Sequence, residues 1–488
     1  MALRARLAAP PAPPQQTWPW HKLKARSLPV SLMLGGDRRM EAESYLSSGF
    51  GIRLSIERRQ AGWRRVGDIA RVWMPGRLKG IQVSSDVGTP FLAATQVFDL
   101  RPIPRKWLAL ARTYDSSSRF VKTGQILVTC SGSVGRATIA YAVHERTLIS
   151  HDLLRVDSLD EGRKGWLYAF LHSPQANAMA VGSHYGHIIK HLETSHLESL
   201  PIPEIEDDAA SRFNDAVQQT IALRNKAYRL TLEAETKFEQ ALGHIDIDDW
   251  GENGFSTKAS TSLLAGRKRL EAAAHNPGVE ALYRHFEKRG KGFCTVVGAG
   301  YDVWVPGRYK RIPAADGVIY RDSEDLIQVN PDLKKRYADC RFGDNYRGRV
   351  KAGWILMPSS GQVYGIIGTA IIAPDELEGQ VVSNHVIRIA PKKSASIRLG
   401  YLVTALSHPT MGRPAIKALA FGSSVPEIAT EDLAVHRVVR LSQAKEDEIA
   451  DLAEAAAKAR SDADLIEQQI GTEAGEIIED FIQASDVS

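Results

Sequence analysis

The sequence is poor in cysteine and has no long hydrophobic run. Its 488 residues include only Cys130, Cys294 and Cys340, and no two of them form a CxxC pair. This spacing argues against a zinc ribbon or a disulfide framework and fits a reducing cytoplasm. No stretch of about eighteen apolar residues occurs, so we expect no membrane-spanning helix. Residues 1–27 are proline-rich and lack the apolar core of a signal peptide, which predicts a flexible N-terminal arm.

Sequence motifs of several enzyme classes are also absent. There is no Gly-x-x-x-x-Gly-Lys-Ser/Thr phosphate loop and no Asn/Asp-Pro-Pro-Tyr/Phe tetrad of the amino-methyltransferases. Gly298-Ala-Gly300 runs into Tyr301-Asp-Val-Trp304 rather than into a helix, which disfavours a dinucleotide site. Neither Pro331-Asp332 nor Pro374-Asp375 is followed by the convincing acid-x-Lys of a nuclease. We therefore expect no catalytic residue in this chain and no cofactor of its own.

What the sequence does contain is one stretch written twice. Residues 124–135 (GQILVTCSGSVG) are answered by residues 353–364 (GWILMPSSGQVY), at an offset of 229. Each copy reads as a short apolar strand entering a tight turn, where glycine can adopt positive φ. A period of this length predicts two domains rather than a solenoid. Further matches, at offsets of 230 to 233, join Arg39-Met-Glu-Ala42 to Arg269-Leu-Glu-Ala272, Val72–Lys79 to Val303–Lys310, and Ile149–Arg155 to Val382–Arg388.

The pattern predicts an α+β protein of two tandem mixed α/β domains, at 28–205 and 261–440. Apolar residues at three–four spacing predict a long helix after each domain, at 206–242 and 441–484, with a linker at 243–260. We expect the two helices to pack as an antiparallel coiled-coil spacer, although a helix of another chain could bury their stripes equally well. The stripe positions proposed to bind partners are Phe213, Leu223, Leu230, Phe238, Ile449, Leu452, Ile466, Ile470, Ile477 and Phe481.

Charge is divided unevenly between domains and helices. The whole chain has a net charge of +5. Residues 206–242 have a net charge of −2 and residues 441–488 of −10, so the remaining residues have a net charge of about +17. A basic globular domain favours a polyanionic partner, and acidic helices are unsuited to the same partner. A polyanion is therefore the expected ligand of the two domains. A protein-binding scaffold and an enzyme with an unrecognised site remain the alternatives.

On these features the chain resembles the specificity (S) subunit of type I restriction–modification systems, or of related methylation-based phage-defence systems. The resemblance extends from about residue 28 to 484. It rests on residues 124–136, Ile149-Ser-His-Asp152, Tyr168–Pro174 and Leu192–Pro203, with a long helix after each half. The second half departs from the pattern, because it has Pro358-Ser-Ser-Gly-Gln362 at the turn and lacks the closing Pro-Ile-Pro.

The resemblance implies two target-recognition domains, each reading one half of a split DNA site, and helices that space them. It implies two methyltransferase (M) subunits as partners, joined by restriction (R) or other effector subunits. Adenine-N6 methylation, with S-adenosylmethionine bound in the M subunits, is likewise implied by the resemblance. Since the second half departs from the pattern, we expect its half-site to differ.

The candidate DNA-contacting residues lie in the Ser-Gly turns, in the loops after Trp-x-Pro-Gly, and in the basic segments before the turns. Each group has a structural alternative, as a β-turn that holds the sheet or as a solvated loop. The histidines between 184 and 196 suggest a DNA-contacting loop or a helix cap, and we expect no metal there because the second copy lacks them. The candidates are Arg77, Lys79, Arg112, Arg119, Lys122, Ser131, Ser133, Arg136, His187, Lys190, Arg308, Lys310, Arg347, Arg349, Lys351, Ser360 and Gln362.

Overall fold

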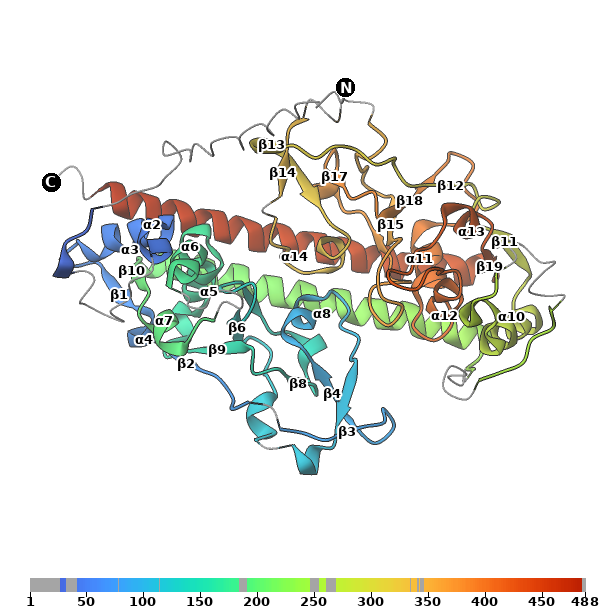
Figure 1. Cartoon of the computed structure of the whole chain (residues 1–488), viewed down its shortest axis with the longest axis horizontal. Coiled ribbons are helices and arrows are strands. Elements are labelled where there is room, and N and C mark those ends of the chain that lie inside the picture. Colours follow the sequence, from blue (N-terminus) through green and yellow to red (C-terminus); the bar gives the residue numbers. More distant parts are fainter. Residues whose placement is uncertain are drawn as a thin grey trace, which may run out of the picture.

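A computed structural model shows two domains arranged along a pair of long helices (Figure 1). Most of the arm predicted at 1–27 and half of the linker predicted at 243–260 lie outside the part of the chain that the structure describes. Within that part, no helix is long and apolar enough to cross a membrane. The described residues are 27–31, 42–77, 79–113, 115–183, 191–245, 254–259, 269–333, 335–339, 342 and 346–484.

The two long helices are α8 (Asp207–Leu242) and α14 (Gln443–Gln483), and they run antiparallel. Arg212 near the start of α8 pairs with Glu473 near the end of α14 at 3.0 Å, whereas Lys237 near the end of α8 pairs with Glu448 at 2.6 Å. The antiparallel helix pair predicted from the sequence is confirmed. Small buried residues allow the close approach, namely Ala210, Ala227, Ala234, Ala456, Ala459, Ala463, Gly471 and Ala474.

The two domains share one strand order, which confirms the duplication. A four-stranded antiparallel sheet runs β2-β9-β6-β7 in the first domain and β12-β18-β15-β16 in the second. Each domain also has one parallel strand pair, β4 with β8 and β13 with β17. Strands near the two ends of each domain pair as well, β1 with β10 and β11 with β19.

Short helices cover the sheets of the first domain. The helical stretch that begins at Lys164 breaks at Ser173, because Pro174 has no N–H to continue the first helix and instead starts the second. The elements are α2 (Ala42–Leu46), α3 (Ser48–Glu57), β1 (Trp63–Arg65), α4 (Val66–Ile69), β2 (Ala70–Trp73), β3 (Gln82–Val83), β4 (Thr89–Leu92), β5 (Lys106–Leu108), β6 (Ile126–Thr129), β7 (Ala137–Ile139), β8 (Leu148–Ile149), β9 (Leu153–Ser158), α5 (Lys164–His172), α6 (Pro174–Ser183), α7 (Thr194–Glu198) and β10 (Pro201–Pro203).

The second domain repeats this plan with a longer β13, which pairs with β14 as well as with β17. Its elements are α10 (Pro277–Arg289), β11 (Phe293–Thr295), β12 (Tyr301–Trp304), β13 (Pro313–Arg321), β14 (Arg336–Tyr337), β15 (Ile355–Pro358), β16 (Ile371–Ile372), β17 (Val381–Val382), β18 (Val386–Pro391), α11 (Leu399–Ser407), α12 (Arg413–Lys417), α13 (Thr430–Ala434) and β19 (Arg437–Val439).

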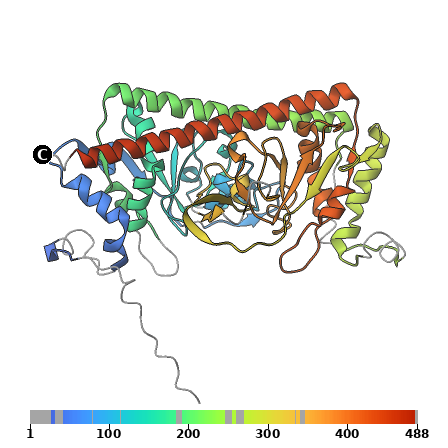
Figure 2. The ribbon, with the colours of Figure 1, turned by 90° about the horizontal axis from the view of Figure 1, so that it is seen from above.

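Each domain core includes the end of the helix that follows the other domain. Ile470, Ala474 and Ile478 of α14 belong to the first core, and Phe238 and Leu242 of α8 belong to the second. Figure 2 shows the helix pair along one edge of the molecule, with both domains on the same side of it. In Figure 1 the outer sheets of the two domains, at β3 and β13, extend to opposite sides of the helices.

Burial within the chain corrects part of the partner-binding prediction. Phe213 packs on Trp166 with ring centroids 5.2 Å apart, and Phe238 packs on Tyr401 at 6.0 Å. Ile449 and Ile470 are also buried. These side chains stabilise the chain itself and are not available to a partner. The remaining stripe residues are half-buried: Leu223, Leu230, Leu452, Ile466, Ile477 and Phe481.

A buried polar cluster joins the middle of the two helices to the first domain. Arg224 of α8, 4% exposed at its side chain, forms ion pairs with Asp464 (3.0 Å) and with the fully buried Glu467 of α14. The Tyr168 hydroxyl of α5 donates to the same Glu467 carboxylate. The adjacent Arg224 guanidinium keeps Glu467 ionised, with a lowered pKa despite its burial.

The two domains also touch each other directly, at equivalent positions of the repeat. Leu92 pairs with Ile149 in the first domain as Arg321 pairs with Val382 in the second. Leu92 and Arg321 are therefore equivalent, and the offset between the two copies in this part of the chain is 229 residues. At this offset Asp99 and Gln328 are equivalent, and they form an antiparallel bridge. The bridge therefore lies on a pseudo-twofold axis that relates the domains.

Candidate nucleic-acid interface

The Ser-Gly turn of the first domain connects β6 to β7. Gly132 has φ of +73° and Gly135 has φ of +83°, so both need the left-handed backbone that glycine tolerates. Ser131 forms a backbone bridge with His191, and its Oγ lies 3.3 Å from the His191 Nδ1. Ser133 is exposed. Ser131 thus helps hold the turn in place, whereas Ser133 is free to face a ligand.

The second domain builds the same turn from different residues. Ser360 bridges to Glu427, and its Oγ lies 2.9 Å from His385 Nδ1 and 3.3 Å from Glu427 Oε1. Gln362 is exposed two residues later. The bridging serine therefore has a structural role in both domains. The exposed tips carry different side chains, Ser133 and Gln362, at the same place in the fold.

Exposed cations follow the first strand of each central sheet. Arg77 and Lys79 come after β2, and Arg308 and Lys310 come after β12. All four side chains are exposed, and their loops occupy equivalent positions in the duplicated fold. Such loops present charge to phosphates without needing a base-specific geometry.

Further basic candidates differ in how available their charges are. Arg112, Lys122 and Lys351 are exposed. Arg347 is also exposed, and its guanidinium lies 5.3 Å from the centre of the Trp304 ring. Arg349 is half-buried, donates to the Gly379 carbonyl at 2.7 Å and pairs with Asp339. The charge of Arg349 is therefore already partly compensated within the domain.

Arg119 is fully buried, which contradicts its prediction as a DNA-contacting residue. Its guanidinium donates to the Gly76 carbonyl at 2.6 Å, beneath the loop that carries Arg77. Sequence reasoning placed it in a basic segment and had no signal for its burial. Its structural role is to support the neighbouring cationic loop.

Arg136 is also turned away from the expected surface. It donates to the Gln328 side chain at 2.8 Å, to the Val329 carbonyl at 2.7 Å and to the Asn330 carbonyl at 2.6 and 3.0 Å. Its guanidinium stacks over Phe98 at 3.8 Å, and burial lowers its pKa to about 10. The hydrogen bonds of this guanidinium are therefore to the other domain, which corrects its prediction as a DNA contact.

Two of the predicted candidates, His187 and Lys190, lie outside the described residues. Within the described part of the chain, no three His, Cys, Asp or Glu side chains are grouped so as to hold a metal ion.

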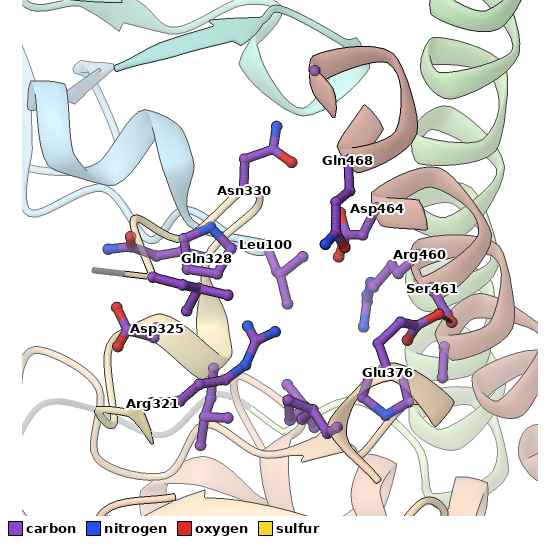
Figure 3. Close-up of a pocket in the computed structure, with 18 of the residues that line it drawn as sticks. Leu100, Arg321, Asp325, Gln328, Asn330, Glu376, Arg460, Ser461, Asp464 and Gln468 are labelled. Atoms are coloured by element: carbon purple, nitrogen blue, oxygen red, sulfur yellow. Dashed lines mark hydrogen bonds between the residues drawn. The ribbon is translucent and has the colours of Figure 1, made fainter. Parts of the chain in front are cut away.

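A cavity of about 290 Å³ lies where the second domain, α14 and a corner of the first domain meet (Figure 3). In the close-up, Arg321 of the second domain faces Arg460 and Asp464 of α14 across the open space, whereas Glu376 lies beside α14 and accepts a hydrogen bond from the Ser461 hydroxyl at 2.6 Å. Burial lowers the pKa of Arg321 and raises that of Asp464 to about 6. Gln328 also lines this cavity, so the space adjoins the contact between the domains.

Comparisons with known proteins find similarity among solved structures only. No protein-family model matches the sequence, and no curated protein matches it. The chain is similar to the S subunit of a type I restriction–modification system from M. genitalium, with 13% identity and a TM-score of 0.26, over 87% of this chain and 96% of that chain. It is also similar to the HsdS subunit from Thermoanaerobacter tengcongensis, with 11% identity and a TM-score of 0.25, over 85% and 96% of the two chains.

The chain is also similar to a third solved structure, from a study of complex assembly and conformational transition of the type I R-M system. The similarity covers 86% of this chain and 97% of that chain, with 12% identity and a TM-score of 0.24. TM-scores this low do not establish a common fold. The functional proposal therefore rests on the duplication, the charge and the contacts described above.

Proposed function

We propose that this chain is a DNA-recognition subunit that binds a split target site and directs partner methyltransferase subunits to it. The observation that carries the proposal is the pair of duplicated domains, held on antiparallel helices and presenting exposed cationic loops at equivalent positions. A DNA duplex has twofold symmetry in its backbone, so two readers related by a pseudo-twofold axis can each face one half-site in the same way. Tethering two weak readers also raises their combined affinity.

The length of the spacer suits a site with a gap. Helix α8 has 36 residues, which corresponds to about 54 Å at 1.5 Å per residue. One turn of B-DNA covers about 34 Å, so readers held near opposite ends of such a helix reach bases more than one turn apart. The differing turn tips, Ser133 and Gln362, favour two different half-sites.

The proposal includes the partners that the sequence resemblance implies. Two M subunits would dock on the assembly, bind S-adenosylmethionine and methylate adenine at N6, and R or other effector subunits would join them. On the outer face of the helix pair, Leu232 and Leu465 are among the exposed large apolar side chains. This face is the proposed docking surface in place of the buried stripe positions.

Methylome sequencing of a host with and without this gene, its neighbouring genes intact, tests the proposal. We expect methylation of one split motif to disappear with the gene. Exchanging residues 28–205 for the corresponding domain of a homologue is expected to change one half of that motif only. An unchanged methylome would refute the recognition role.

The salt dependence of binding distinguishes DNA recognition from the alternative of a protein-binding scaffold. DNA binding that releases counterions weakens steeply as salt rises, with a slope set by the number of phosphate contacts. The basic charge of the domains favours this outcome. An interaction insensitive to salt would support the scaffold, and methyl transfer or cleavage by the isolated chain would support an enzyme.

A further inference from the structure

We propose that Arg136 is a positioning residue that fixes the gap between the two half-sites by fastening the second domain to the first. This inference rests on the proposed function for its consequence on DNA, but the fastening itself is a property of the chain alone. We call the contact of Arg136 and residues 98–100 with residues 327–330 the interdomain clasp.

The clasp is a two-stranded backbone contact closed by one side chain. The Leu100 N–H donates to the Ile327 carbonyl at 2.7 Å, and the Val329 N–H donates to the Phe98 carbonyl at 2.7 Å. Because Leu100 is equivalent to Val329 and Phe98 to Ile327, these two bonds exchange under the pseudo-twofold axis. Val329 is fully buried within an apolar cluster of the first domain.

Arg136 breaks this symmetry and closes the contact from one side only. Its planar guanidinium reaches three consecutive residues of the second domain with four hydrogen bonds. By the pairing of β7 with β6 and of β16 with β15, the position equivalent to Arg136 is Thr369, whose short side chain donates to the Ile366 carbonyl of its own domain. Nε, Nη1 and Nη2 of the planar guanidinium all donate in this arrangement, and a lysine ammonium cannot reproduce that fork.

Packing around the clasp leaves the second domain incompletely supported. The cavity of about 290 Å³ separates Arg321 from α14 directly beside Gln328 and Asn330 (Figure 3), while Glu376 at its rim accepts a hydrogen bond from Ser461 of α14 at 2.6 Å. An open space of this size supplies no close-packed surface that would hold the domain at one angle. The hydrogen bonds of the clasp, together with the stacking of Arg105 of the first domain over the Tyr364 ring of the second at 5.6 Å, therefore define at this point how the two domains face each other.

The consequence for DNA is a single permitted gap. The helix pair sets the distance between the attachment points of the domains, while the clasp sets the angle at which their outer sheets project. A change of angle moves a reading surface along and around the duplex. Weakening the clasp is expected to admit sites whose gap is one base pair shorter or longer, without a loss of affinity at the original gap.

Hydrogen exchange on the full-length chain tests the clasp without DNA. The substitution Arg136→Lys keeps the charge and removes the fork. We expect the Leu100 and Val329 amides to be protected in the wild type and to exchange at least about tenfold faster in the variant, with the sheet β2-β9-β6-β7 unchanged. Gln328→Met, which removes only the side-chain acceptor, is expected to give a smaller acceleration. Unprotected amides in the wild type, or no acceleration in Arg136→Lys, would overturn the clasp.

Binding of the complex with its methyltransferase subunits to a library of sites with varied gaps tests the consequence. The wild type is expected to select one gap, and Arg136→Lys is expected to bind that gap with similar affinity and the neighbouring gaps at least about fivefold better than the wild type does. Arg77→Ala serves as the contrast, because loss of a phosphate contact weakens all gaps alike.

Two outcomes would overturn the assignment, and they have different meanings. If Arg136→Lys retains the strict gap, or weakens all gaps uniformly, Arg136 does not set the spacing. If the wild-type complex binds no split site, the proposed function fails and the gap assignment with it, while the exchange experiment still reports on the clasp.

Discussion

Arg155 and Arg388 occupy equivalent positions in the two domains, and both are fully buried. Each guanidinium donates to carbonyls of residues at the same three places in its own domain. The acceptors are Ile149 (3.2 Å), Ser150 (2.9 Å) and Leu153 (2.5 Å) for Arg155, and Val382 (2.6 Å), Ser383 (2.8 Å) and Val386 (2.5 Å) for Arg388.

Replacing either arginine with methionine is expected to destabilise its own domain. Arg155→Met or Arg388→Met leaves buried carbonyls without a donor, at a cost on the order of 3 kcal/mol. Urea denaturation followed by hydrogen exchange measures the loss and assigns it to one domain. Arg58→Met, at an exposed arginine, is the matched control. Equal stability of control and test variants would show that the buried arginines are dispensable.

The ion pair of Arg224 and Glu467 is expected to behave as a unit. Arg224→Met alone leaves a buried carboxylate without its main partner and is expected to cost about 3–5 kcal/mol. In the double variant Arg224→Met/Glu467→Met, part of this loss is expected to be recovered, because the fully buried carboxylate is removed with its partner and the remaining Asp464 side chain is 36% exposed. Urea midpoints of the wild type, both single variants and the double variant give the coupling energy. A double variant as unstable as the sum of the singles would contradict the prediction.

Asp99, on the pseudo-twofold axis, is expected to make stability fall as pH rises. Burial raises its pKa to about 7, against 3.8 ordinarily, with Arg105 the largest opposing influence. Because the folded-state pKa is above the unfolded value, the folded protein binds more protons between about pH 4 and 7, so its stability decreases across that window.

The variant Asp99→Asn removes this ionisation. Since the carboxyl is only partly shielded from solvent, we expect Asp99→Asn to be more stable than the wild type by on the order of 2 kcal/mol at pH 8. The difference is expected to shrink at pH 4, where Asp99 is protonated in the folded state and roughly half protonated in the unfolded state. Thermal unfolding at the two pH values measures this. A difference independent of pH would mean that Asp99 does not titrate near neutrality.

Neutralising the exposed cationic loops is expected to weaken DNA binding without changing its sequence preference. Each of Lys79→Ala and Lys310→Ala removes one potential phosphate contact, so the slope of log affinity against log salt is expected to fall by about 0.9. Titrations of the complex at several salt concentrations measure the slope. Arg229→Gln, on the exposed face of α8, is expected to leave the slope unchanged. An unchanged slope in the lysine variants would place the DNA elsewhere.

The sequence predicted the architecture better than the roles of its charged residues. Repeat offsets and three–four periodicity are local patterns, and they led to the two domains and to helices that the structure places at Asp207–Leu242 and Gln443–Gln483. Burial of Arg119 and Arg136 depends on segments distant in sequence, Gly76 in one case and residues 328–330 in the other. No local pattern distinguishes such an arginine from a surface one.

The stripe residues of the helices show the same limit. Periodicity identified the apolar faces correctly, but it does not say what covers them. Phe238 and Ile470 complete the core of the opposite domain.

For the buried arginines, one cue to a structural role was present in the sequence. The duplicated segments Ile149–Arg155 and Val382–Arg388 end in the same arginine, and a residue shared by both domains points to a structural role rather than to the reading of two different half-sites.

The sharing of helix ends between the cores has a consequence for synthesis. Ile221 and Ile470 belong to one core, yet roughly 250 residues separate them, which at about 5–20 residues per second takes the ribosome roughly 12–50 s. During that interval the first domain is outside the ribosome with the place of α14 vacant and its apolar wall uncovered. The nascent chain therefore passes through a period in which it is exposed to chaperones, and to pairing with another nascent copy, before its own last helix arrives.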